Sequence, residues 1–219
     1  MPKSTEITIP VPNGPDGAGM PATLVRPDSP MGAGIVLVQE IFGRTAYMRK
    51  RAMDLAENGY TVVLPQVYWR IGIDDIPEDS PDALMVAVGH SQAVDWDQAV
   101  ADIRTAITWL RADPESEHAV ALVGFCFGGG LAYAALQGVR GPEHADALVS
   151  YYGSALPNLV DGPTVHAASL HHFGDADAFI PREAIDHIRE VVEADGAEFH
   201  LWDDANHAFD NPTPELGLH

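Results

Sequence analysis

A single cysteine lies in a glycine-rich turn and is the residue best placed for nucleophilic chemistry. Cys126 is the only cysteine among the 219 residues, and Gly124 and Gly128 flank it two positions away on either side. Residues 119–123 before it form an apolar run of strand length, and residues 131–136 after it are typical of a helix. Strand, sharp turn and helix in this order make a nucleophile elbow, with a cysteine where serine is usual. The positive end of the helix dipole would stabilise negative charge on the sulfur.

A thiol nucleophile needs a base, and the base needs an acid that orients it. Asp175 and Asp177 follow one expected strand, and His207 follows the next expected strand. Groups at the carboxyl ends of parallel strands gather at one edge of the sheet. The chain order nucleophile, acid, histidine is that of the α/β-hydrolases. We therefore predict that His207 transfers the proton of Cys126 and that one of the two aspartates orients it. Spacing alone does not choose between these aspartates.

Strands and helices alternate along most of the chain, which predicts a mostly parallel sheet with helices on both faces. An antiparallel hairpin is expected first, because two segments of alternating polarity flank a turn. Residues 66–92 have a weaker pattern, which predicts an irregular segment with a short helix that roofs the site. The expected hairpin segments are 7–11 and 22–25, the later strands are 34–38, 61–64, 119–123, 147–153, 167–174 and 198–202, and the helices include 47–58, 94–111 and 181–194.

The bulk composition is that of an ordinary globular protein. Hydrophobic residues make up 46% and charged residues 20%, and we expect residues 1–219 to form a single α/β domain. The formal net charge of -20 disfavours nucleic acid and anionic membrane surfaces as partners. The N-terminal residues lack the apolar core of a secretory signal, and no apolar run is long enough to cross a bilayer. Together with the unpaired cysteine, this predicts a cytoplasmic protein, either a monomer or a small homo-oligomer.

The chain resembles the dienelactone hydrolase family in five sequence blocks that occur in the family's order. These blocks are residues 39–43 (QEIFG), 124–129 (GFCFGG), 151–153 (YYG), 174–181 (GDADAFIP) and 206–209 (NHAF). The resemblance spans essentially the whole chain. It implies an α/β-hydrolase fold and the hydrolysis of a carboxylic ester or lactone, a small-molecule substrate. It also implies that the acid is Asp177, which matches the family's Asp-x-Phe-x-Pro motif.

Further residues around the elbow belong to the expected site. Glu40 directly follows a buried strand, where a carboxylate is costly unless it is paired or serves a site. In the family, the matching glutamate contacts the resting cysteine and helps to convert it to the thiolate when substrate arrives. The backbone N–H groups of Ile41 and Phe127 are the expected oxyanion hole. The residues predicted to line the substrate pocket are Phe42, Arg44, Tyr68, Trp69 and Tyr152.

The chain departs from the family where the carboxylate of dienelactone is held. The family has an arginine before the long helix and another just beyond the catalytic histidine, whereas Leu84 and Asn211 occupy those places here. Neither side chain replaces an arginine in a pair with a carboxylate. We therefore expect poor hydrolysis of the anionic dienelactone. Arg44, Arg49 and Arg70 are the arginines of other loops that could bind its carboxylate instead.

No cofactor and no metal are expected. His166, His171 and His172 are the only clustered histidines, but neighbouring residues of a strand point to opposite faces, and no cysteine or carboxylate completes a tetrahedral set. Two alternatives to an esterase stay open. One is a thioesterase that uses the same acyl-enzyme, and the other is a non-catalytic ligand-binding or thiol-sensing protein that keeps the fold.

Overall fold

The computed structural model describes residues 1–73, 75–76 and 82–212. Its strands are β1 (Lys3–Ile9), β2 (Met20–Arg26), β3 (Ala33–Val38), β4 (Thr61–Pro65), β5 (Ala119–Phe125), β6 (Ala147–Tyr151), β7 (Ala168–Gly174) and β8 (Glu198–Trp202). Its α-helices are α1 (Ala46–Glu57), α2 (Ala83–Ala93), α3 (Trp96–Arg111), α4 (Phe127–Leu136) and α5 (Arg182–Ala194). Short 3-10 turns are η1 (Pro15–Gly17), η2 (Val67–Ile71), η3 (Pro114–Ser116) and η4 (Leu156–Asn158).

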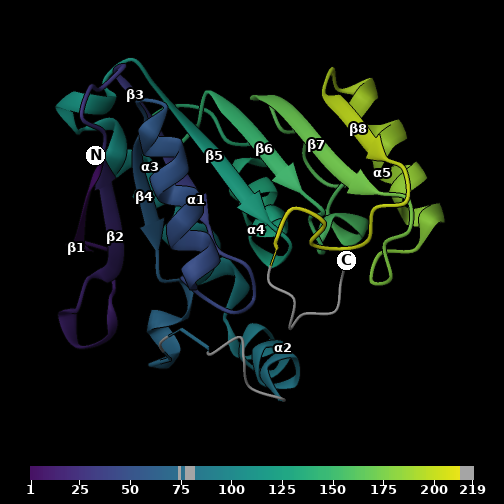
Figure 1. Ribbon diagram of the computed structural model, residues 1–219, viewed down its shortest axis with the longest axis horizontal. Coiled ribbons are helices and arrows are strands. Elements are labelled where there is room, and N and C mark those ends of the chain that lie inside the picture. The colour runs from purple at the N-terminus through teal and green to yellow at the C-terminus, as the bar shows by residue number, and fades with distance from the viewer. Residues whose placement is uncertain (74, 77–81, 213–219) are drawn as a thin grey trace.

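The strands form one sheet in the order β1-β2-β4-β3-β5-β6-β7-β8 (Figure 1). The pairs β1·β2 and β2·β4 are antiparallel, and the pairs from β4 through β3 to β8 are parallel. The predicted N-terminal hairpin and the predicted mostly parallel sheet are both confirmed. Because β3 and β4 are continuous apolar runs, they need cover on both faces, and they occupy the interior of the sheet.

Helices cover the two faces of the sheet unequally (Figure 1). On one face, α1 packs its buried Met48 and Ala52 against the side chains of β3 and β4. On the other face, α3, α4 and α5 cover the sheet, and α3 buries Ile103 and Ile107 at helical spacing. The side chains of β3 alternate between these two clusters, as strand geometry requires. The elements around the central strands are therefore held by apolar packing on both sides.

The register of the parallel strands brings their carboxyl ends to one edge. Val38 pairs with Gly124, at the ends of β3 and β5, and Phe125 pairs with Tyr151 at the ends of β5 and β6. The loops that follow β3, β5, β7 and β8 therefore start at neighbouring points of this edge. Figure 1 shows α2 beyond the same edge, which agrees with the roof predicted within residues 66–92. Residues 74 and 77–81 of that segment lie outside the described residues.

No helix in the described part of the chain combines the length and the apolar character that crossing a bilayer requires.

Candidate active site

Cys126 lies in a strained turn between β5 and α4. Its backbone has φ 52° and ψ -115°, a conformation that residues other than glycine rarely adopt and that is typical of functional sites. Three backbone hydrogen bonds maintain it. The N–H of Cys126 donates to the Tyr151 carbonyl oxygen at 3.0 Å, and the Cys126 carbonyl oxygen accepts from the N–H groups of Ser154 at 3.1 Å and Gly130 at 3.2 Å. The turn holds the sulfur at the edge of the sheet.

The first turn of α4 passes so close to the end of β3 that a side chain at Gly128 does not fit. A Cβ atom there would lie 2.4 Å from the carbonyl oxygens of both Val38 and Gln39. We expect Gly128→Ala to lower the free energy of unfolding by about 1–3 kcal/mol, because backbone atoms must move. Urea denaturation measures this change.

The matched control is Gly89→Ala in α2, where a Cβ atom would meet nothing within 4 Å. Alanine is the better helix former by about 1 kcal/mol, so this variant should be as stable as the wild type or slightly more stable. Equal stabilities of Gly128→Ala and the wild type would show that the elbow is not packed as described.

The structure brings Cys126, His207 and Asp177 into one hydrogen-bonded row. Nε2 of His207 lies 3.0 Å from Sγ of Cys126, and Nδ1 of His207 lies 2.8 Å from Oδ2 of Asp177. The Asp177 side chain is completely buried, whereas Cys126 is partly accessible. A thiol, an imidazole and a carboxylate are thus in contact in the order that a proton-transfer triad requires.

Of the two aspartates that the spacing left open, only Asp177 contacts His207 among the described contacts. Its second oxygen, Oδ1, accepts the backbone N–H groups of Phe179 at 2.8 Å and Ile180 at 2.9 Å, which fix the carboxylate in place. The carboxylate of Asp175 instead accepts the backbone N–H of Asp204 at 2.8 Å and ties two loops together. The choice depends on the turn after β7, where Asp177 lies deeper than Asp175.

The charge state of His207 follows from its two neighbours. Burial lowers the pKa of His207, but the negative charge of Cys126 and the hydrogen bond to Asp177 outweigh burial and raise this pKa to about 10. His207 therefore keeps its proton at neutral pH when it faces a Cys126 thiolate. An imidazolium in this position can donate a proton to a leaving group.

Asp210 anchors the loop that carries His207, and sequence reasoning missed it. Its carboxylate accepts hydrogen bonds from the hydroxyls of Tyr47 and Tyr152, and Nη2 of Arg51 donates to the Asp210 carbonyl oxygen at 2.9 Å. The ring of Tyr152 also lies 4.9 Å from that of His207. These contacts join α1, the turn after β6 and the His207 loop. No local pattern reveals them, because the partners lie far apart in sequence.

Glu40 is buried in the cavity wall near the elbow. It is 2% exposed, and its Oε2 accepts a hydrogen bond from Nδ2 of Asn211 at 3.1 Å. Asn211 is itself 1% exposed, so this pair is shielded from water. Asn211 thus lies behind Glu40 and is not part of the cavity lining, although Glu40 and Cys126 both are.

Ile41 and Phe127, the expected oxyanion-hole residues, both line the cavity at Cys126. Phe127 is the first residue of α4, and the first N–H groups of a helix have no acceptor within it. Ile41 lies in the loop after β3, where the Tyr68 hydroxyl donates to its carbonyl oxygen at 2.6 Å. The backbone of Phe127 is therefore held by α4, and that of Ile41 by the hydroxyl of Tyr68.

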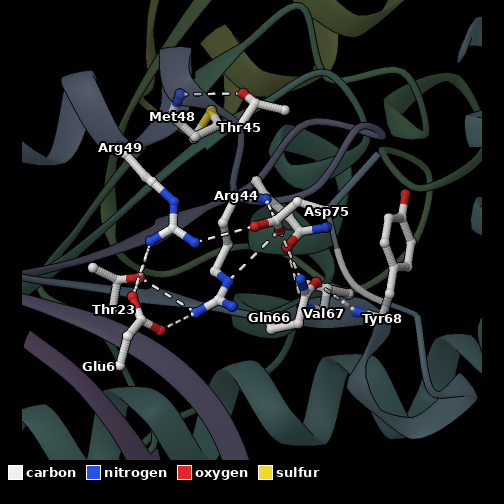
Figure 2. Close-up of polar contacts among 11 residues, drawn as sticks. Glu6, Thr23, Arg44, Thr45, Met48, Arg49, Gln66, Val67, Tyr68 and Asp75 are labelled. Atoms are coloured by element: carbon white, nitrogen blue, oxygen red, sulfur yellow. Dashed lines mark hydrogen bonds and ion pairs between the residues drawn. The ribbon is translucent and has the colours of Figure 1, made fainter. Parts of the chain in front are cut away.

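A charged network anchors the loop after β3 to the N-terminal hairpin (Figure 2). The backbone N–H of Arg44 donates to Oδ1 of Asp75 at 2.6 Å, and its guanidinium lies 2.8 Å from Glu6. Arg49 contacts the same two acids, Glu6 at 2.9 Å and Asp75 at 3.1 Å. Gly43, with φ 96°, turns the chain so closely past Asp75 that a Cβ would lie 2.9 Å from its carboxylate. The network fixes the loop that carries Glu40 and Ile41.

A cavity of about 200 Å³ opens at the sulfur of Cys126. Of the five residues predicted to line it, Phe42 does so. Leu84, which the sequence analysis placed where the family holds the substrate carboxylate, also lines the cavity. Sequence reasoning missed Phe179, which lies inside the block that contains Asp177, and Val88 and Ser91 of α2, which carry no local functional signal. The complete lining is Glu40, Ile41, Phe42, Leu84, Val88, Ser91, Cys126, Phe127, Ser154, Phe179, His207 and Ala208.

Arg44, Tyr68, Trp69 and Tyr152 do not line this cavity, contrary to the prediction from sequence. Each has another role in the structure. Arg44 belongs to the network with Glu6, and Nε1 of Trp69 donates to Asp102 at 2.8 Å. The hydroxyl of Tyr68 donates to the Ile41 carbonyl oxygen, and that of Tyr152 donates to Asp210, so both tyrosines support loops of the site. Aromatic residues near the site in the sequence therefore included one that lines the cavity, Phe42, and others that support the surrounding loops.

No group of three or more His, Cys, Asp and Glu that could hold a metal ion occurs within the described ranges. His171 and His172 point to opposite faces of the sheet, as strand alternation predicts. The ring of His171 packs against Tyr133 of α4, and that of His172 stacks on Tyr151 on the other side.

Comparisons with known proteins agree with this geometry. The sequence profile of the dienelactone hydrolase family matches residues 20–219. The chain is 34% identical over 198 residues to a carboxymethylenebutenolidase of Pseudomonas putida, covering 89% of this chain and 82% of the relative. It is 31% identical over 196 residues to a carboxymethylenebutenolidase of Pseudomonas sp. strain P51, covering 88% and 80%. A crystal structure of a Klebsiella pneumoniae protein named after dienelactone hydrolase superposes with a TM-score of 0.78 at 27% identity, covering 96% of this chain and 89% of that one.

Proposed function

The chain belongs to the dienelactone hydrolase family of ester and lactone hydrolases, and we propose that Cys126, His207 and Asp177 carry the reaction through an acyl-enzyme. One observation carries the proposal. The imidazole of His207 bridges the sulfur at 3.0 Å and a buried carboxylate at 2.8 Å, at the mouth of a cavity. A structural cysteine needs neither a strained elbow nor this partner.

In the first half of the reaction, the thiolate of Cys126 attacks the carbonyl carbon of the substrate and forms a tetrahedral intermediate. The N–H groups of Phe127 and Ile41 donate to its oxyanion. The intermediate collapses, the bond to the alcohol oxygen breaks, and Nε2 of His207 gives its proton to that oxygen. The products are a thioester on Cys126 and an alcohol, which stays attached to the acyl group when the substrate is a lactone.

In the second half, neutral His207 takes a proton from water, and the resulting hydroxide attacks the thioester. The second tetrahedral intermediate expels the thiolate and releases the carboxylic acid, which restores the starting ion pair. Asp177 orients the imidazole throughout and stabilises its charged form. Glu40 tunes the nucleophile, because a carboxylate buried in the same cavity wall opposes negative charge on the sulfur.

The test is to trap the acyl-enzyme. Wild-type protein is mixed with 4-nitrophenyl acetate, quenched in acid within the first turnovers and digested for mass spectrometry. We expect one acetyl group on the peptide that contains Cys126, together with a burst of 4-nitrophenol of about one equivalent per active site. Turnover without this adduct, or an adduct on another residue, would refute the mechanism.

A further inference from the structure

The cavity at Cys126 is lined mainly by hydrocarbon. Its walls include Phe42, Phe127 and Phe179, together with Leu84 and Val88 on the inner side of α2. The titratable side chains in the lining are Glu40, Cys126 and His207, and no lysine or arginine lines the cavity among the described residues. His207 is already engaged by Asp177 and by the sulfur. A negatively charged group on the substrate would therefore meet no lysine or arginine in the described lining, and the imidazole of His207 already has two partners.

The arginines of the surrounding loops are committed elsewhere. Arg44 and Arg49 both bind Glu6 and Asp75 (Figure 2). Arg70 binds Asp102 with contacts of 2.7 and 2.8 Å. Moving Arg70 to the cavity would leave the buried carboxylate of Asp102 without its guanidinium partner, which is costly. Moving Arg44 or Arg49 would break its ion pairs with Glu6 and Asp75. Arg44, Arg49 and Arg70 therefore have structural roles in ion pairs, and none of them lines the cavity to bind substrate.

Glu40 adds to this discrimination. Its buried carboxyl group accepts a hydrogen bond from Asn211 and forms part of the cavity wall. A carboxylate on the substrate would enter a mostly apolar space that already contains a carboxyl group and the nucleophilic sulfur. Removing a charge from water without a counter-ion is strongly unfavourable, and a second carboxyl group nearby supplies no counter-ion.

We propose that the site selects uncharged esters or lactones with an apolar acyl group and rejects acyl groups that carry a carboxylate. This inference rests on the proposed hydrolase function and names its substrate class. The selectivity has a definite origin, which is that the described lining contains no lysine or arginine and that His207 is already bound by Asp177 and the sulfur, and not the overall charge of the protein. A cavity of about 200 Å³ limits the enclosed part of the acyl group to a short chain.

Three matched esters test the substrate class. These are 4-nitrophenyl hexanoate, the methyl ester of 4-nitrophenyl adipate, and 4-nitrophenyl adipate with a free carboxylate. The two adipates differ by one methyl group in size but by a full charge. We expect kcat/KM for the free carboxylate to be at least about 100-fold below that for its methyl ester. A ratio within about threefold, or a preference for the carboxylate, would overturn the inference.

Two valines of α2 provide a matched pair of variants that tests the origin of the selectivity. Val88 lines the cavity and is 39% exposed, whereas Val86 does not line it and is 38% exposed. Val88→Arg should reduce the ratio of kcat/KM for the methyl ester to kcat/KM for the free carboxylate about tenfold, because the arginine supplies an ion-pair partner for the substrate carboxylate. Val86→Arg makes the same change of net charge on the same helix and should leave the ratio within about twofold.

The outcomes separate the two levels of the proposal. An unchanged ratio in Val88→Arg, or an equal change in both arginine variants, would overturn the assignment of selectivity to the cavity lining. Failure of the proposed function looks different, since wild-type protein would then hydrolyse none of the three esters, and the inference on substrate class would fall with it.

Discussion

Cys126→Ala is expected to reduce ester hydrolysis to near the uncatalysed background, with a loss in kcat of about 10⁴-fold or more. The reason is that the variant keeps the cavity, His207 and the oxyanion-hole donors but has no atom that can form the acyl-enzyme. The measurement is the steady-state hydrolysis of 4-nitrophenyl acetate, with the spontaneous rate subtracted. Equal rates in the variant and the wild type would remove the cysteine mechanism.

Two controls separate loss of chemistry from loss of structure. The thermal unfolding midpoint of Cys126→Ala should stay close to that of the wild type, because a small side chain replaces a small one. Since Cys126 is the only cysteine, iodoacetamide should abolish wild-type activity at one equivalent of label. Stoichiometric labelling of a wild-type protein that hydrolyses no ester would instead support the thiol-sensing alternative.

Asp177→Asn is expected to lower kcat by about 10³–10⁴-fold. An amide presents an N–H as readily as an oxygen, so it no longer fixes which nitrogen of His207 carries the proton. The variant also removes one of the two groups that raise the pKa of His207 to about 10. Because this pKa is raised, the imidazolium persists until the pH rises through about 10, and we expect wild-type activity to fall there. In the variant, this alkaline fall should move to lower pH.

Asp175→Asn is the matched control, because it makes the same chemical change two residues earlier. Its carboxylate accepts a backbone N–H from Asp204 and has no described contact with His207. We expect kcat within about threefold of the wild type and an unchanged alkaline limb in the pH profile of kcat. Comparable losses in both variants, or an Asp177→Asn profile that keeps its alkaline limb, would exclude the role assigned to Asp177.

The site depends on supports that lie outside the cavity. Asp75 and the arginines hold the loop of Ile41, and Asp210 with two tyrosines holds the loop of His207. Both supports connect segments from distant parts of the chain. Precise placement of catalytic groups requires such surroundings, because small displacements of reacting groups cost large factors in rate.

Local sequence patterns were sufficient for the fold and for the elbow at Cys126. Apolar runs of strand length, helical spacing in α3 and glycines around Cys126 are short-range signals, since they reflect backbone geometry and the burial of one face. They predicted the parallel sheet, the elbow and the position of His207 after the last strand. Leu84 and Asn211 also showed from sequence that the family's arginines are missing. The choice of Asp177 over Asp175 needed the resemblance.

Only the tertiary structure decided which side chains meet at the site. Phe42 and Arg44 are two residues apart, yet one lines the cavity and the other binds Glu6 on the far side of the loop. The contact between Asp210 and Tyr47 joins residues 163 positions apart, and no period or local motif encodes it. The physical reason is that backbone preferences act over a few residues, whereas lining, charge pairing and burial depend on which distant segments pack together.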